Sequence, residues 1–317
     1  MTRKLTLALL AVCTLAAGGC VQATRDFTST RPWGDYERIV VQTANGRVRL
    51  TCGQVDEFRI AGRTRARGTT FGAAKANLDA IEIVAQPDEQ QPRTLQVAVH
   101  VPENLRHEWS GTDLEIGVPA ACAAQIETSN APIYVVNAKD CDLETSNGLI
   151  DVERISGQVE ARTSNGRIKA LCVAGDLTAC SSNGAIQVEN VQGTCRLTTS
   201  NALIKVLAAA GNVDATTSNG PIRFEGNDRL ETGPTAIAGA TVALRTSNGP
   251  ISLLLPKLLA GELSLTTSNG PIHASLLHIA ADIHRQAQGE LRATLNNGGP
   301  ARVTAETSNG PIRVDFR

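Results

Sequence analysis

Apolar and polar residues alternate along the chain in short blocks, and from residue 124 onward these blocks recur at a constant spacing. Each block surrounds the sequence Thr-Ser-Asn-Gly or a near copy, and the Asn positions from 130 to 219 are 17, 18, 18, 18 and 18 residues apart. Positions three and five residues after the Asn, and four and six before it, are apolar in nearly every copy. A period of two is typical of a β-strand with one buried face, so each block predicts two short strands joined by a turn. The turn residues are Asn130, Asn147, Asn165, Asn183, Asn201, Asn219, Asn248, Asn269 and Asn309, with an earlier copy at Asn45.

The recurrence of a single unit predicts an all-β fold. A unit of about 18 residues cannot bury its apolar face alone, whereas stacked units bury one another's faces. We therefore expect a β-solenoid of stacked coils of about 18 residues, with an irregular N-terminal cap. A meander of hairpins is the alternative, because Asn-Gly is a strong hairpin turn. A hairpin array should alternate two turn types, however, and here one unit recurs.

The repeated turn has a structural interpretation, because a motif that recurs at a fixed period is usually architecture. Stacked Asn side chains can hydrogen-bond from one coil to the next as an amide ladder. The Thr or Ser two residues before the Asn can cap the turn with its hydroxyl. Ala131 and Ala202 replace the Gly, and Ala131 precedes Pro132, which favours extended backbone. The left-handed residue of the turn, if there is one, is therefore expected to be the Asn and not the Gly.

One outward-facing column of the repeat is the candidate binding stripe. Its members lie four residues after the turn Asn, and stacking would align them in a row. A solvated face without a ligand is the alternative interpretation. The stripe consists of Tyr134, Asp151, Lys169, Gln187, Lys205 and Arg223.

The N-terminus has the features of an export signal. Residues 2–4 give it a positive start, and residues 5–17 form an apolar stretch that is too short to span a bilayer. Small residues follow and end at Cys20, which resembles the lipid-modified Cys of a bacterial lipoprotein. Cleavage after Ala23 and release as a soluble exported protein is the alternative.

These patterns divide the chain into four segments. We expect a lipoprotein-type signal peptide at 1–20, a tether at 21–34, a cap with the first strands at 35–127, and the repeats at 128–317. Within the cap, the pattern of residues 71–84 predicts a short helix that runs into a strand.

Two further features concern the ends of the stack and its insertions. Trp33, Tyr36 and Trp109 are expected to cover the open end of the stack. Residues 225–241 and 275–295 are expected to be inserted loops, the second with a short helix.

Composition excludes some classes of protein. The net charge is -1 and no long run of one sign occurs, which argues against a nucleic-acid partner. Aromatic residues make up only 3%, which leaves few platforms for stacking sugars. In an exported chain the remaining cysteines permit disulfides, with fifteen connectivities open. Cys141 and Cys195 lie in an inward column and are expected to be buried thiols. The six cysteines are Cys52, Cys122, Cys141, Cys172, Cys180 and Cys195.

Residues with catalytic or metal-binding chemistry are sparse. His273, His278 and His284 lie within twelve residues, but a solvated loop explains them more simply than a metal site. The stripe offers few residues that could act as the base and the charge-neutralising groups of polysaccharide cleavage. No nucleophile elbow, phosphate loop or calcium-binding repeat occurs. We therefore expect no catalytic residue, no cofactor and no metal, and the protein is not expected to be an enzyme.

The recurring unit TSNGxIxV, preceded by VxVP strands and a lipoprotein-like signal, resembles the bacterial putative-adhesin family of β-strand-repeat proteins. The resemblance covers most of residues 35–317 and implies the fold, but no catalytic residues. With it, we expect a structural or adhesive role in the cell envelope, with a lipid anchor in the membrane and a glycan or an envelope protein as partner. The outer membrane is favoured over the inner one, and secretion follows if Cys20 is not lipidated. The alternatives are a glycan-binding or carbohydrate-active protein, or an envelope-stress accessory protein.

Overall fold

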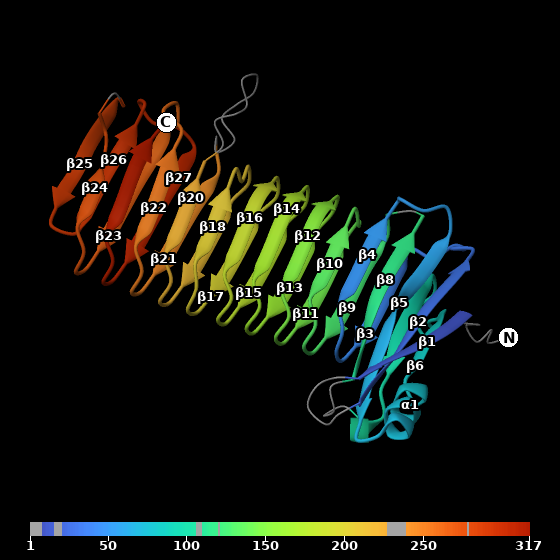
Figure 1. The fold of residues 1–317 in the computed structure, drawn as a ribbon. Coiled ribbons are helices and arrows are strands. Elements are labelled where there is room, and N and C mark those ends of the chain that lie inside the picture. Colours follow the sequence, from blue (N-terminus) through green and yellow to red (C-terminus); the bar gives the residue numbers. More distant parts are fainter. Residues whose placement is uncertain (1–7, 16–20, 106–109, 120, 227–238, 278) are drawn as a thin grey trace. The chain divides into compact units, whose positions relative to one another are not determined.

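The computed structural model describes residues 8–15, 21–105, 110–119, 121–226, 239–277 and 279–317. This described part is all-β, with strands in two sheets that we name sheet A and sheet B (Figure 1). Its helical segments are α1 (Phe71–Asp79) and the 3-10 turn η1 (Glu103–Leu105). The chain divides into two compact units, residues 1–152 and 153–317.

The first unit contains the cap and the first repeats. In sheet A the strands follow the order β1 (Ala8–Leu15), β2 (Val21–Arg31), β5 (Phe58–Gly68), β8 (Gly111–Val118), β4 (Val48–Cys52), β10 (Ile133–Val136) and β12 (Ile150–Ile155), whose last residues belong to the second unit. In sheet B they follow the order β11 (Cys141–Thr145), β9 (Ala123–Thr128), β3 (Arg38–Thr43), β7 (Thr94–His100) and β6 (Glu82–Pro87).

The second unit consists of repeats and a terminal hairpin. In sheet A the order is β14 (Ile168–Val173), β16 (Ile186–Val191), β18 (Ile204–Leu207), β20 (Ile222–Glu225), β22 (Ile251–Leu255), β28 (Ile312–Phe316) and β24 (Ile272–Ala274). In sheet B the order is β13 (Val159–Thr163), β15 (Leu177–Ser181), β17 (Cys195–Thr199), β19 (Val213–Thr217), β21 (Thr241–Thr246), β27 (Ala301–Thr307), β23 (Gly261–Thr267), β26 (Glu290–Leu295) and β25 (Ala281–Ala287).

The two strands of one repeat enter different sheets, and each pairs in parallel with the equivalent strand of its neighbour. Ile168 of β14 is aligned with Ile186 of β16, and Leu177 of β15 with Cys195 of β17. A hairpin meander would instead pair consecutive strands in antiparallel fashion. In the described residues, antiparallel pairs occur only among β1, β2, β5 and β8, between β6 and β7, and among β23, β25 and β26. The hairpin alternative is therefore excluded for these repeats.

The apolar columns of the repeat form the core between the sheets. The Ile three residues after the turn is fully buried in β14, β16, β18, β20, β22 and β28. Burial of one such side chain contributes roughly 1.5–3 kcal/mol, so the column is a large part of the stabilisation. Ile272 in β24 is the exception, because it is only half-buried at the end of sheet A.

The last repeat in the sequence is not the last in space. Strands β27 and β28 lie between the pair β21–β22 and the pair β23–β24 in the two sheets. The stacking order at this end therefore differs from the sequence order. Apolar periodicity cannot reveal such an exchange, because every unit offers the same buried face.

The segment 275–295 corrects one expectation. It does not contain the expected short helix: residues 281–287 form β25, which pairs with β26 in an antiparallel hairpin. Residues of β25 are mostly exposed, so the pattern that resembled a helix did not reflect a buried stripe. Most of the other expected loop, 225–241, lies outside the described residues.

The cap is an insertion between β4 and β9. As predicted, α1 is followed by a strand, β6. The cap also contains β7 and β8. Thr70 caps α1 by accepting a hydrogen bond from the Ala73 amide. Strands β3 and β4, which precede the insertion, pair with β9 and β10, which follow it.

The expected tether at residues 21–34 is instead largely a strand. β2 pairs with β5 over eleven residues, from Val21 with Gly68 to Arg31 with Phe58. It buries Ala23 and Phe27, and this burial explains why the segment is not free. The stretch expected to be the signal-peptide core contains β1, whose backbone pairs with β2.

Aromatic residues after β2 pack within the cap. The Trp33 ring stacks on Phe58 at a centroid distance of 6.0 Å, and Tyr36 contacts Trp33 edge-on at 5.5 Å. Trp109, the third residue expected to cover the end of the stack, lies outside the described residues.

The left-handed backbone positions also correct an expectation. None of the turn Asn residues has a positive φ; of the Gly residues that follow them, Gly46 alone does. In five successive repeats a left-handed residue occurs instead near the end of the sheet A strand, seven residues after the turn Asn. This column contains Asn137, Arg154, Cys172, Asn190 and Ala208, with φ between 54° and 60°.

Candidate interaction surfaces of the repeat

The turn Asn side chains are joined by hydrogen bonds along each unit. In the first unit Asn147 donates to Asn130, which donates to Asn45, at 2.7 and 2.8 Å. In the second unit, from Asn183 onward, each Nδ2 donates to the Oδ1 of the preceding Asn in the stack at 2.7–2.9 Å. The order there is Asn165, Asn183, Asn201, Asn219, Asn248, Asn309 and Asn269. These amides bond to one another, so the ladder is structural and not a free binding surface.

In seven turns the Gly amide donates to the hydroxyl two residues before the Asn. The Gly184 amide donates to Ser181 Oγ at 2.9 Å, and the Gly220 amide donates to Thr217 Oγ1 at 3.2 Å. The Gly is required by close approach of the backbone: a Cβ at Gly184 would lie 1.7 Å from the carbonyl oxygen of Gly166. At Ala131 and Ala202 the spacing accommodates a methyl group.

The candidate binding stripe divides between the two units. In the first unit Tyr134 and Asp151 lie in β10 and β12, and the Arg49 guanidinium lies over the Tyr134 ring at 5.0 Å. In the second unit the other members are directly aligned across β14, β16, β18 and β20. The structure extends this row by three residues that the sequence reasoning missed. The complete row is Lys169, Gln187, Lys205, Arg223, Ser252, Arg313 and His273.

Three cations of this row have no acidic partner within 4.0 Å among the described residues: Lys169, Lys205 and Arg223. Arg313, by contrast, is held by Asp315, with Nε and Oδ2 2.7 Å apart. The neighbouring outward column of sheet A adds two acids, Glu189 and Glu225, and Glu225 pairs with Arg317 at 3.8 Å. The described central part of this face therefore carries a surplus of positive charge.

The outward face of sheet B in the second unit is different, because its arginines are mostly ion-paired. Arg245 bridges Asp214 and Glu306 at 3.3 and 3.5 Å, and Arg302 pairs with Glu262 at 3.1 Å. Arg162 pairs with Glu160. The contrast between the faces makes sheet A the better candidate for an anionic ligand.

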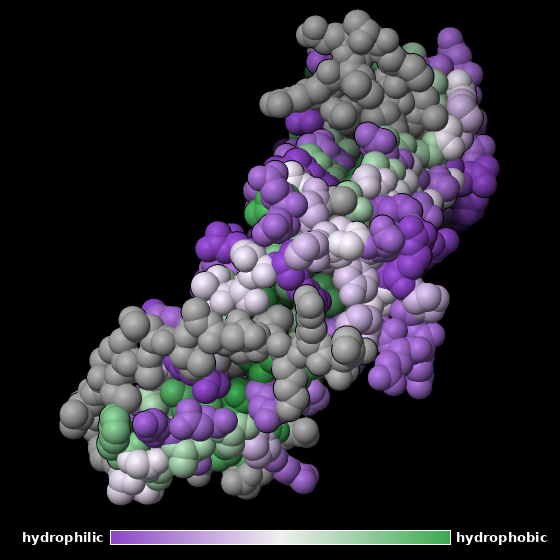
Figure 2. Space-filling model, turned by 90° about the vertical axis from the view of Figure 1, so that its right-hand side faces the viewer, coloured by the Kyte–Doolittle hydropathy of each residue, from purple (hydrophilic) through white to green (hydrophobic). Residues whose placement is uncertain are grey.

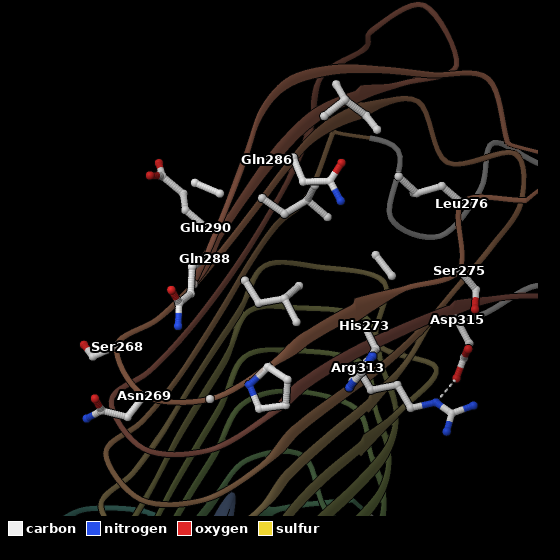
Figure 3. A pocket seen from close by; sticks show the side chains of 18 residues that line it. Ser268, Asn269, His273, Ser275, Leu276, Gln286, Gln288, Glu290, Arg313 and Asp315 are labelled. Atoms are coloured by element: carbon white, nitrogen blue, oxygen red, sulfur yellow. Dashed lines mark hydrogen bonds and ion pairs between the residues drawn. The ribbon is translucent and has the colours of Figure 1, made fainter.

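A groove of about 1130 Å³ lies at the end of the second unit, between β24 and the hairpin β25–β26. Sheet A ends there with β24, whereas sheet B continues for two further strands. Figure 3 shows His273, Arg313 and Asp315 on one side of the groove and Gln286, Gln288 and Glu290 on the other. The half-buried Ile272 also lines it, because no further sheet A strand covers that side chain.

The charged groups of the groove are paired with one another or with their own strands. Glu290 binds Arg285 and Arg292 at 2.7 and 2.9 Å. The hydrogen bond from Arg313 lowers the pKa of Asp315 below its ordinary value. No aromatic residue lines the groove among the described residues. Its chemistry is therefore polar and ionic, without a stacking platform.

The other candidate residues do not converge on a site. His284 contacts Thr294, with Nε2 and Oγ1 2.6 Å apart, and His278 lies outside the described residues. In the described part of the chain no three His, Cys, Asp or Glu side chains are grouped to hold a metal ion. Cys141 and Cys195 are buried as expected, and Cys172 is exposed. Cys20, the expected lipidation site, also lies outside the described residues.

The surface shows no broad apolar area in the view of Figure 2, where small hydrophobic areas are interrupted by hydrophilic residues. The large apolar side chains exposed in the described residues are Phe71, Leu258, Leu277 and Ile283. No helix that the structure describes is both long enough and apolar enough to cross a membrane.

Comparison with known proteins gives similar structures only. No protein-family model and no curated sequence matches the chain. A putative adhesin from Bacteroides fragilis is 12% identical with a TM-score of 0.37, over 92% of this chain and 97% of that one. One from Parabacteroides merdae is 11% identical with a TM-score of 0.32, over 92% and 96%. A putative cell adhesion protein from Clostridium sporogenes is 10% identical with a TM-score of 0.25, over 93% and 100%. At these TM-scores and identities the likenesses give no information on function or on a ligand.

Proposed function

We propose that the protein is a non-enzymatic β-solenoid of the bacterial cell envelope, lipid-anchored at Cys20, that displays the cations of sheet A to an anionic glycan. The observation that carries this proposal is the aligned row with Lys169, Lys205 and Arg223, which lack acidic partners among the described residues. Parallel pairing places neighbouring strands about 4.8 Å apart, so Lys169 and Lys205 are held two strands apart and Lys205 and Arg223 one strand apart.

A linear polysaccharide with repeated acidic groups fits such a row. One exposed ion pair contributes little, at most about 1 kcal/mol. Several pairs that form along one rigid row gain from effective concentration, because each contact brings the next one into reach. Neutral sugars usually need aromatic platforms, and the aligned row of the second unit contains none.

The proposed anchor has a structural consequence. β2 begins at Val21, directly after Cys20, so the acylated residue would adjoin a strand and not a flexible tether. Removal of residues 1–19 would take away β1, while β2 would keep its pairing with β5. Incorporation of radiolabelled palmitate in a bacterial host tests the anchor: we expect label in the wild type and none in Cys20→Ser. An unlabelled wild type would contradict it.

The display proposal is tested by surface plasmon resonance on immobilised alginate, a polyuronate, with neutral dextran as the control surface. We expect the wild type to bind alginate and not dextran, with weaker binding as salt increases. The variant K169E/K205E/R223E should bind at least about tenfold more weakly, the equivalent of about 1.4 kcal/mol.

The matched control carries the same change of charge on the other face, R196E/R245E/R302E, and should keep the affinity for alginate. Equal losses of affinity in both variants would show that binding depends on the net charge of the protein and not on the sheet A row. Absence of binding to alginate by the wild type would oppose display to acidic glycans and favour a structural or accessory role in the envelope.

A carbohydrate-active protein is the second candidate, because two acidic residues, Glu290 and Asp315, are among those that line the groove of the second unit, on opposite sides (Figure 3). Paired carboxylates are the usual catalysts of glycoside cleavage. The lowered pKa of Asp315 is the opposite of what a general acid needs. Release of reducing sugar that Glu290→Gln abolishes would favour this candidate over display.

A further inference from the structure

A cysteine stands at each of the two points where the chain passes between the stack of repeats and the cap. Cys52 is the last residue of β4, and Cys122 directly precedes β9. The intervening residues, 53–121, form the cap, while β3 and β4 pair with β9 and β10. The two cysteines therefore stand at the exit and the entry of one large insertion.

Their sulfur atoms are 4.0 Å apart, and both side chains are buried. Among the described cysteines this is the one pair whose sulfurs lie within that distance. The backbone around them is fixed: Asn137 Nδ2 donates to the Cys52 carbonyl at 3.3 Å, and the Lys139 amide donates to the Cys122 carbonyl at 2.9 Å. The two thiols are thus held facing each other inside the first unit.

We propose that Cys52 and Cys122 form a disulfide that closes the cap onto the stack of repeats. A disulfide bond is about 2.05 Å long, so each sulfur has to move by about 1 Å, which a small side-chain rotation can supply. The bond would close a loop that contains the whole cap. Such a bond stabilises a protein mainly because it restricts the unfolded chain, and the effect grows with loop length.

The reaction needs an oxidant, and we take a small-molecule disulfide such as oxidised glutathione. One cysteine thiolate attacks it to form a mixed disulfide and releases one glutathione thiolate. The second cysteine thiolate then attacks the protein sulfur, and the second glutathione leaves. Two cysteine S–H bonds and one S–S bond are lost, one protein S–S bond and two glutathione thiols are gained, and the protons balance.

In the folded protein the contact between the two thiols shifts their pKa values in opposite directions. The hydrogen bond from the Cys122 thiol lowers the pKa of Cys52, because it stabilises the thiolate. The same contact and the burial of Cys122 raise the pKa of Cys122. Both sulfurs are inaccessible in the folded protein, so the reaction belongs to folding or to local opening of the cap.

Peptide mapping of the full chain tests the proposal, because trypsin places the three nearby thiols in different peptides. Cys52 falls in residues 50–59, Cys122 in 107–139 and Cys141 in 140–154. The protein is refolded with oxidised glutathione, alkylated and digested without reduction. We expect peptide 50–59 linked to 107–139. Alkylated Cys52 and Cys122, or a link between Cys122 and Cys141, would overturn the proposal.

A thermal measurement gives an independent result. Reduction should lower the Tm of the wild type by at least about 5 °C. The same shift should persist in Cys195→Ala, whose thiol is buried elsewhere, and vanish in Cys122→Ala. If Cys122→Ala does not fold, Cys52→Ala replaces it, and the peptide map of the wild type still decides. A shift that is absent from the wild type would contradict the stabilising role.

Discussion

Asn219 Nδ2 donates a hydrogen bond to Asn201 Oδ1 at 2.9 Å, and Asn219 Oδ1 accepts a hydrogen bond from Asn248 Nδ2 at 2.8 Å. Asn219→Ala therefore removes two hydrogen bonds. Each is partly exposed, so we expect a loss of about 1–2 kcal/mol in the free energy of unfolding, measured by urea denaturation. Thr198→Ala, an exposed change on sheet B, serves as the control and should have a much smaller effect. Equal stability of Asn219→Ala and wild type would show that the amide ladder does not stabilise the stack.

The turn glycines give a second prediction. A Cβ at Gly184 would lie 1.7 Å from the Gly166 carbonyl oxygen and 2.9 Å from Ser181 Oγ. Gly184→Ala therefore forces two neighbouring repeats apart, and we expect a loss of about 1–3 kcal/mol. Gly72→Ala is the control, because nothing lies within 4 Å of the added carbon and helix α1 favours Ala. A Gly184→Ala protein with an unchanged Tm would exclude close approach as the reason for Gly.

The left-handed column predicts a stabilising change. Ala208 has a φ of 54°, and Asn occupies the same column at residues 137 and 190. Asn tolerates this conformation better than Ala, so Ala208→Asn should raise the free energy of unfolding by up to about 1 kcal/mol. Ala210→Asn, two residues later at an exposed position without a positive φ, is the control. If both changes have the same effect, backbone strain at Ala208 is not the cause.

The repeat could be predicted from the sequence because its information is local. The 18-residue period, the buried Ile column and the Asn turn each follow from residues within one unit. The left-handed column could not be predicted in this way. It holds Arg154, Cys172 and Ala208, three residue types with no preference for that conformation, so the column leaves little trace in the sequence.

The ends of the stack were predicted less well, for a related reason. Residues 21–31 have no regular alternation of apolar residues, yet β5 pairs with them along their whole length. The exchange of the last two repeats places Arg313 before His273 in the sheet A row, and no spacing in the sequence indicates that order. Both features depend on pairing between segments that are far apart in the sequence, and the apolar pattern within a segment does not specify its partner.

The buried thiol of Cys195 leads to a prediction on alkaline stability. Burial, with a smaller contribution from Asp176, raises its pKa from 9.0 to about 12. A raised pKa means that the folded state keeps the neutral thiol while the unfolded state ionises above pH 9. The contribution of the Cys195 thiol to the free energy of unfolding is therefore fully present below pH 9. It is lost as the pH rises towards 12, by about 1.4 kcal/mol per pH unit.

Cys195→Val tests this reasoning, because Val already occupies the same column at residues 159 and 213 and should pack there. Urea unfolding at pH 7, 9 and 10.5 should show a shallower loss of stability in the variant than in the wild type. Tyr and Lys titrate in both proteins, so the difference between the two slopes isolates the thiol. Thr198→Val, at an exposed position of the same strand, should leave the slope unchanged. Parallel slopes for wild type and Cys195→Val would mean that the unfolded and folded thiols ionise alike.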